Sequence, residues 1–128
     1  MSDYKNLPIY NDVFKLLKYF YQKIPTFSKQ YKYLLGKKIL DSLVKSITLI
    51  IDIIEIKEKE DKKDLLNKII KKMNKVLIYT RIAHELNQFQ SDEVYFFASK
   101  EIIKIIDQAE NWKMFFNKEK HPQNCSQK

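Results

Sequence analysis

The sequence predicts an all-α protein, an up-down-up-down four-helix bundle, from three observations. One Gly and three Pro in 128 residues are too few for the tight turns of a β-protein. Apolar residues recur at spacings of three and four in four separate segments. Short polar connections join these segments, which is typical of antiparallel neighbouring helices. A chain of this length is expected to form one domain, here residues 1–117.

The first helix is predicted over residues 9–24. Ile9, Val13, Leu16 and Phe20 fall on one face at helical spacing. Pro25 then ends the helix, because the residue before a proline avoids the α region.

The second helix is predicted over residues 31–56. Its apolar stripe consists of Leu40, Leu43, Ile47, Ile50 and Ile54. The stretch 47–56 is rich in β-branched residues, so a buried strand is the alternative. Helix is favoured because no turn residues delimit a strand and no partner strand is visible. A membrane span is excluded, since the run has about ten residues with Asp52 inside it and a bilayer needs about 20.

The third and fourth helices are predicted over residues 64–87 and 91–117. A charged connector, residues 57–64, is expected to form a solvated turn before the third helix. Ser91 and the acids after it are suited to the start of the fourth helix. Residues 118–128 lack apolar periodicity, and we expect them to be a disordered polar tail.

The composition argues against an enzyme, a metal and a cofactor. Phosphate cradles need several glycines, and only Gly36 is present. Two histidines and one cysteine are too few for an ordinary zinc site. His84 and Glu85 are adjacent and so point about 100° apart on a helix, which favours a structural histidine over a general base. We therefore expect no catalytic residue.

A cytoplasmic location is expected. A single cysteine allows no intrachain disulfide, which fits a reducing compartment. The first residues, with Asp3 and Lys5 before any long apolar run, do not resemble a signal peptide.

Several apolar residues lie outside the core stripes and predict contacts between copies of the chain. The alternative is that bundle helices simply have broad apolar arcs. Arg81, the single arginine, is expected at the edge of the core face, where it is suited to a carboxylate or a backbone carbonyl across an interface. A structural ion pair is favoured there over a phosphate contact. The candidate interface residues are Tyr10, Phe14, Tyr21, Arg81, Phe96, Phe97, Ile103 and Phe115.

The lysines are unevenly distributed along the chain. Lys and Arg number 24 against 16 Asp and Glu, a formal net charge of +8. Residues 13–40 contain seven lysines and no acid, and residues 65–84 contain five cations and no acid. Such blocks favour a phosphate-rich partner, RNA or DNA, although lysine is also an ordinary solubilising residue. The candidate nucleic-acid-binding residues are Lys15, Lys18, Lys29, Lys32, Lys37, Lys38, Lys68, Lys71, Lys72 and Lys75.

Aromatic residues interleave with the first lysine block. Base stacking is one use for them. Packing against neighbouring helices is the favoured interpretation, with stacking a minor hypothesis. The residues are Tyr19, Tyr21, Phe27, Tyr31 and Tyr33.

Short motifs along the chain resemble one family of small four-helix bundles. They are Tyr31–Lys37 (YKYLLGK), Tyr79–Leu86 (YTRIAHEL), Tyr95, and the stretch from Ile102 to Trp112-Lys113, with Pro25 before them. The family contains the Avd accessory proteins of bacterial diversity-generating retroelements and the 23S ribosomal RNA intervening-sequence proteins. The likeness spans about residues 10–117.

This resemblance implies a barrel-like homopentamer that is not catalytic. It further implies that basic surface binds nucleic acid, and that the protein associates with a reverse transcriptase to support mutagenic cDNA synthesis. Two alternatives stay open. One is an intervening-sequence type of bundle of unknown role, and the other is a purely protein-interaction helical module.

Overall fold

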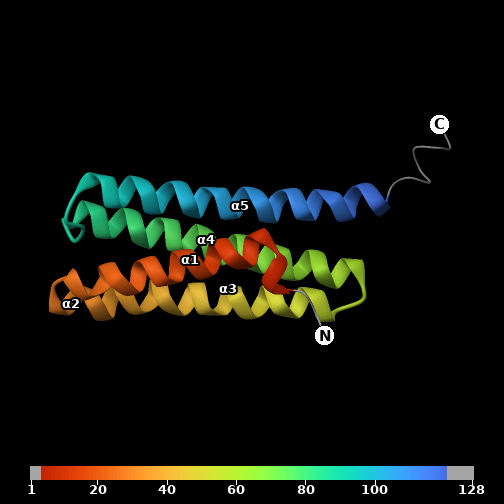
Figure 1. Ribbon diagram of the computed structural model, residues 1–128, viewed down its shortest axis with the longest axis horizontal. Helices are drawn as coiled ribbons and strands as arrows, with labels where there is room; N and C mark the ends of the chain where they lie inside the picture. Colours follow the sequence, from red (N-terminus) through yellow and green to blue (C-terminus); the bar gives the residue numbers. More distant parts are fainter. Residues whose placement is uncertain (1–3, 121–128) are drawn as a thin grey trace.

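The computed structural model describes residues 4–120, and side chains from residue 4 to residue 117. Four long helical rods pack side by side and antiparallel (Figure 1). The first rod is α1 (Pro8–Lys23), and the second joins α2 (Lys29–Tyr31), η3 (Lys32–Gly36) and α3 (Lys37–Glu55). The third is α4 (Lys59–Glu85) and the fourth is α5 (Asp92–Lys120). Single 3₁₀ turns, η1 (Tyr4–Asn6) and η2 (Ile24–Thr26), flank α1.

The order of the rods around the bundle is α1, α3, α4, α5. Helix α3 packs against α4, α4 against α5, and α1 against both α3 and α5. The predicted all-helical bundle is confirmed. Residues 4–120 contain no β-strand, so the helix favoured over residues 47–55 is confirmed as well.

One hydrophobic core runs the length of the bundle, and its largest side chains include Phe20, Ile39, Ile50 and Met73. The predicted stripe of the second rod was displaced by one residue. Leu43 and Ile50 are buried as predicted, but the other buried residues of α3 are Ile39, Ser46 and Ile53. The predicted Leu40, Ile47 and Ile54 are half-buried beside them. Ser46 is buried at no hydrogen-bonding cost, because its hydroxyl donates to the Ser42 carbonyl at 2.8 Å.

The predicted connector over residues 57–64 was wrong for most of its length, because α4 already begins at Lys59. Glu60 and Asp61 in its first turn favour the helix N-terminus. The backbone N–H of Lys62 donates to the Glu58 carbonyl at 3.0 Å. Its ammonium donates to the Ile53 carbonyl at 2.6 Å, near the end of α3. The charged run therefore starts one helix and caps the preceding one.

The fourth helix is also longer than predicted and ends at Lys120 instead of residue 117. Residues 118–120 therefore belong to the helix and not to the predicted tail. The rest of that tail, residues 121–128, lies outside the described residues.

The second rod begins two residues early, at Lys29, and contains a π-helical turn, η3, that was not predicted. An unbroken α-helix would place Lys32, seven residues before the buried Ile39, on the core face. The π turn adds one residue, so Tyr31 packs against the core and Lys32 is exposed. Gly36 closes the turn against η2, since a Cβ at position 36 would lie 2.5 Å from Ile24 Cγ2.

The turn between α4 and α5 is fixed by backbone hydrogen bonds. Asn87 has φ 58°, and the N–H groups of Asn87 and Gln88 donate to the carbonyls of His84 and Ala83 at 3.0 and 2.9 Å. This is the Schellman arrangement with asparagine in the left-handed position. The Gln88 side chain accepts the Ser28 N–H at 2.7 Å, which ties this turn to the start of the second rod.

Candidate nucleic-acid interface

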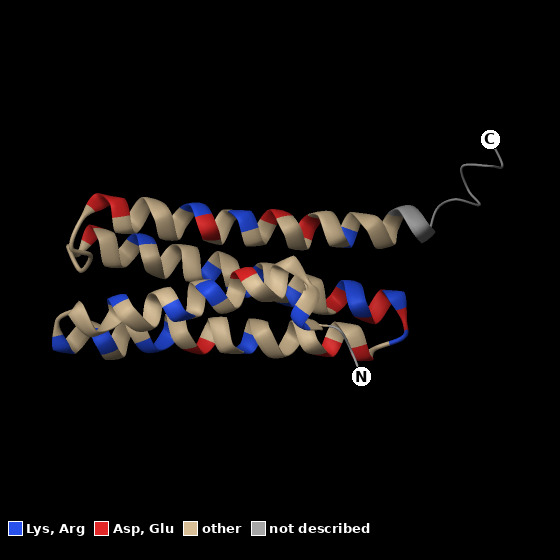
Figure 2. Cartoon of the chain, in the orientation of Figure 1, with Lys and Arg blue, Asp and Glu red and all other residues tan. Residues whose placement is uncertain are grey.

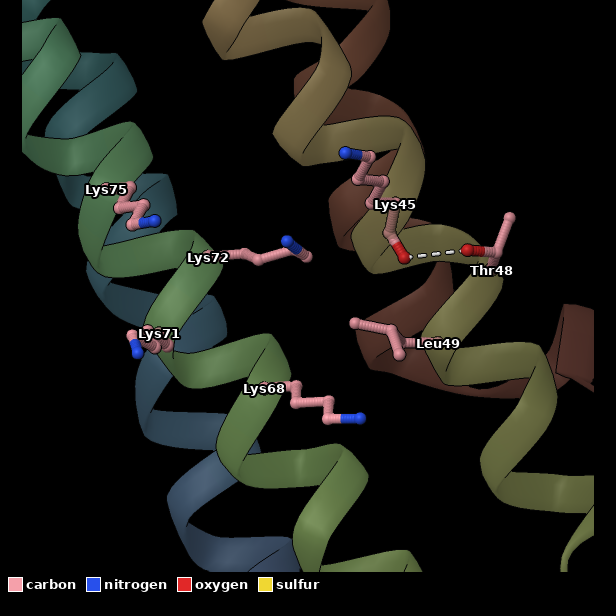
Figure 3. Close-up of a pocket in the computed structure, with 7 residues that line it drawn as sticks. All are labelled: Lys45, Thr48, Leu49, Lys68, Lys71, Lys72 and Lys75. Atoms are coloured by element: carbon pink, nitrogen blue, oxygen red, sulfur yellow. Dashed lines mark hydrogen bonds between the residues drawn. The ribbon is translucent and has the colours of Figure 1, made fainter.

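An open groove between α3 and α4 gathers five lysines (Figure 3). Its volume is about 440 Å³. Lys68 and Lys72 extend from α4 toward α3, Lys45 comes from α3, and α1 and α5 lie behind (Figure 3). We call it the α3–α4 groove; its lining is Lys45, Thr48, Leu49, Lys68, Lys71, Lys72 and Lys75.

No acid neutralises these lysines. No Asp or Glu lines the α3–α4 groove, and none of its five lysines forms an ion pair within 4.0 Å with any residue from 4 to 117. Burial, and then the positive charges of the other four lysines, lower the pKa of Lys72 below its ordinary value. The free protein thus concentrates positive charge at one place. A polyanion is the ligand that such a field attracts.

The remaining lining is suited to a phosphate backbone. The Thr48 hydroxyl donates to the Lys45 carbonyl at 2.8 Å, so its oxygen stays available as an acceptor. Leu49 is a half-buried apolar residue between the cations. Because the charged groups are flexible ammoniums and not rigid guanidinium forks, the groove offers charge with little geometric selectivity.

The ten predicted lysines do not form one surface. Lys68, Lys71, Lys72 and Lys75 lie on one side of α4 and line the α3–α4 groove. Lys15 instead lies over the Phe97 ring of α5 at 5.9 Å, and Lys18 over Phe14 of its own helix at 5.5 Å. The remaining four, Lys29, Lys32, Lys37 and Lys38, come from the first part of the second rod, where Figure 2 shows blue ribbon at the lower left.

Within that second group, Lys29, Lys32 and Lys37 line another groove, between α1 and α3. Lys37 is paired there with Asp41 at 3.6 Å, one turn along α3. Lys38 is exposed and lines neither groove. The predicted set is therefore divided among at least three places on the bundle.

Lys45 was missed by the sequence prediction. It lies in the second rod between Asp41 and Asp52, outside the acid-free blocks that defined the candidates. A signal was present, because Lys38 and Lys45 are seven residues apart and so lie on one side of a helix. The side that faces α4 follows only from the packing, in which Ser46 contacts Met73.

The predicted interface residues are partly exposed. Two are half-buried: Tyr10 packs against Tyr4 with ring centroids 5.1 Å apart, and Phe97 against Tyr19 at 4.7 Å. Arg81 is exposed and forms no ion pair within 4.0 Å with the described residues. The exposed apolar members are Phe14, Tyr21, Phe96, Ile103 and Phe115.

The prediction also missed exposed apolar residues on α4. Ile78, Ile82 and Leu86 follow one another at intervals of four, and all three are exposed. They were missed because apolar residues outside the core stripes were predicted on the first and fourth helices only. Together with Phe96 and Ile103 of α5, they make apolar surface available for association.

His84 is half-buried at the end of α4, and its structural role stays a prediction. Its ring stacks on Tyr95 at a centroid distance of 4.0 Å and lies 3.8 Å from the Asp92 carboxylate. The described residues hold no cluster of three or more His, Cys, Asp or Glu side chains arranged for a metal ion. None of the helices in residues 4–120 is both long and apolar enough to cross a bilayer.

Comparison with known proteins leaves the family open. The sequence matches no protein-family profile and has no significant match among curated proteins. The likeness to the Avd and intervening-sequence family therefore rests on the short motifs alone.

Proposed function

We propose that this chain is a non-enzymatic accessory protein that binds the phosphates of RNA or DNA in the α3–α4 groove. One observation carries the proposal: five lysines from two helices converge without an acid among them. Contacts of this kind depend on backbone charge, so binding is insensitive to sequence and weakens steeply with salt.

The energetics of the free groove support the same ligand. Like charges one helical turn apart repel by a few tenths of a kcal/mol per pair. Lys68, Lys71, Lys72 and Lys75 contain such pairs, and Lys45 adds a fifth charge from the facing helix. A bound polyanion reverses this repulsion, whereas water and small ions only screen it.

The wider role rests on the family resemblance. We propose a cytoplasmic homo-oligomer, a pentamer in the resembling family, that assists the reverse transcriptase of a diversity-generating retroelement. The exposed apolar residues of α4 and α5 support self-association, because isolated soluble proteins keep apolar patches small. An intervening-sequence type of bundle would share the groove and the assembly but not the enzyme partner.

A charge-matched pair of variants tests the groove. Replacing Lys68, Lys71, Lys72 and Lys75 by Gln should lower affinity for a labelled oligonucleotide by about 10³-fold at low salt and reduce the slope of log K against log salt by about three to four. The control replaces Lys5, Lys15, Lys57 and Lys100, none of which lines the groove. Equal losses in both variants would mean that net charge alone, and not the groove, attracts the ligand.

A purely protein-interaction module is the second candidate, favoured by Ile78, Ile82 and Leu86 on α4. For that function, light scattering would show an oligomer while oligonucleotide binding stays undetectable at moderate salt. Replacing Ile82 and Ile103 by Asp should then abolish the assembly. In the leading proposal, the wild-type protein binds both its copies and nucleic acid.

A further inference from the structure

A second groove, between α1 and the second rod, combines exposed aromatic rings with free cations. Its volume is about 680 Å³, and we call it the α1–α3 groove. Tyr21 of α1 and Tyr33 of η3 line it and are 59% and 71% exposed. Leu40 and Val44 of α3 add apolar surface. By contrast, Tyr19, Phe27 and Tyr31 are packed into or against the core.

Tyr33 is an exposed residue of the π turn. It lines the α1–α3 groove and also a second hollow of about 550 Å³ formed with Ser28, Lys29 and Gln30. Open space therefore adjoins this residue in both hollows. Gly36 packs the turn closely against Ile24. Helical π turns occur frequently at functional sites.

The cations beside these rings are unpaired. Lys29 and Lys32 line the groove, are exposed, and form no ion pair within 4.0 Å with any residue from 4 to 117. Lys37 differs, since it is paired with Asp41. A phosphate therefore finds two free ammoniums within a groove that also holds two exposed rings. That combination of stacking surface and charge is the chemistry of single-stranded nucleic-acid binding.

We propose that the α1–α3 groove binds an unpaired nucleotide of single-stranded RNA or DNA. The base stacks on Tyr33, and the adjoining phosphate is bound by Lys29 and Lys32. Duplex does not use this site, because its bases are already stacked and paired. The inference rests on the proposed function in taking a nucleic acid as the ligand, but it uses a different groove and different residues.

The test uses the full chain and a short single-stranded oligonucleotide carrying 2-aminopurine, whose fluorescence falls when it stacks. We expect wild-type protein to quench the probe, and Tyr33→Leu to lose the quenching and about tenfold in affinity. Tyr33→Phe keeps the ring and should keep both. Affinity for a duplex of the same length should not change in Tyr33→Leu. Phe96→Leu, which removes an exposed ring outside the groove, is the matched control.

Three results would overturn the proposal. If Tyr33→Leu binds single strands as wild type does while the groove-lysine variant is impaired, the nucleic-acid function stands and the base site is wrong. If Tyr33→Leu instead changes the molar mass by light scattering without altering affinity, the surface joins copies of the chain. If neither single strand nor duplex binds wild type at moderate salt, the proposed function fails together with this site.

Discussion

Two contacts between neighbouring helices of this bundle, the α1–α5 seam and the α3–α4 seam, differ in how their charged side chains are paired. At the α1–α5 seam, the Lys104 ammonium lies 3.6 Å from Asp12 Oδ2 and 3.8 Å from Glu101 Oε1. The Gln108 amide donates to the same Asp12 oxygen at 2.6 Å. At the α3–α4 seam, five lysines meet with no acid among the lining residues.

The contrast separates charges that are paired within the chain from charges that have no partner among the described residues. Both seams join long amphipathic helices around one core, so helix packing does not require an uncompensated cluster. At the α1–α5 seam the groups are partly buried and paired within the chain. The charges of the α3–α4 seam lack such partners, which is what a site for an external polyanion requires.

The largest expected effect on polyanion affinity comes from placing an acid among the lysines of the α3–α4 groove, as at the α1–α5 seam. Lys72→Glu places an acid among four lysines, so polyanion affinity should fall by about 50-fold at low salt. The same change should raise the free energy of unfolding by about 0.5 kcal/mol, because repulsion becomes attraction. Binding titrations and denaturant melts measure the two effects. Lys100→Glu, the same charge change outside the groove, should leave affinity within about twofold.

The residue that joins the groove from α3 gives the next effect. Lys45→Gln should lower polyanion affinity by about eightfold at low salt, as expected for the loss of one phosphate contact. Lys38→Gln, two turns earlier on the same side of the rod, should have little effect, since it does not line the groove. Similar losses for both substitutions would show that the ligand follows α3 and is not confined to the groove.

The next prediction removes the ion pairs of the α1–α5 seam. Lys104→Met removes the cation shared by Asp12 and Glu101, and should lower the free energy of unfolding by about 1 kcal/mol. Lys100→Met is the control, because Lys100 is exposed and forms no ion pair with the described residues. Oligonucleotide affinity should be the same in both variants. Equal melting curves would mean that the seam's ion pairs contribute nothing to stability.

The smallest effect is a pH dependence. Burial, and then the neighbouring positive charges, lower the pKa of Lys72, so its ammonium loses its proton at a lower pH than an ordinary lysine does. Polyanion affinity should therefore fall by about threefold from pH ~7.5 to the lower edge of the ordinary lysine range. Lys72→Arg, which stays protonated, should not show this early loss.

In the absence of ligand, protein stability should change with pH in the opposite direction to polyanion affinity. The folded state disfavours protonated Lys72, so the free energy of unfolding should rise as pH increases from the lowered pKa toward the ordinary value. If the free energy of unfolding of the wild type were as independent of pH in this range as that of Lys72→Arg, the lowered pKa of Lys72 would be contradicted.

The sequence predicts the helical architecture well because each rod has its own apolar period. Ile9, Val13, Leu16 and Phe20 are buried as their spacing predicts. The four lysines from Lys68 to Lys75 share one side of α4, as the periodicity of one helix predicts, but this side flanks the core and does not lie opposite it, since Lys72 is half-buried. Periodicity within one helix also missed some features, because the stripe of α3 was displaced by one residue and the exposed apolar row of α4 was not predicted.

Features that depend on two helices were less accessible. Lys15 is in an acid-free block, yet it lies over Phe97 of α5 and not beside Lys72. Lys45 is flanked in sequence by acids, yet it joins the groove because α3 and α4 are antiparallel, with Ser46 opposite Met73. Charge counting along the chain does not show which lysines share a groove, since proximity to α4 or α5 is set by packing register.

The π turn was missed for a different reason. Helical periodicity assumes a constant angle per residue, and one added residue changes the phase of all that precede it. Lys32 at a core position of the unbroken helix was the available signal. The same phase shift explains why Tyr31 packs against the core, whereas Tyr33 would be exposed in either register.

A π turn is a helical turn that contains one residue more than an α turn. Deleting Tyr33 in frame would return the second rod to an unbroken helix with Tyr31 still directed inward and Ile39 onward unchanged in phase. An in-frame deletion of one residue here would thus change the exposed surface of the rod and keep its buried residues in phase. This arrangement would allow related chains to differ in length by one residue at this point and still form the same bundle.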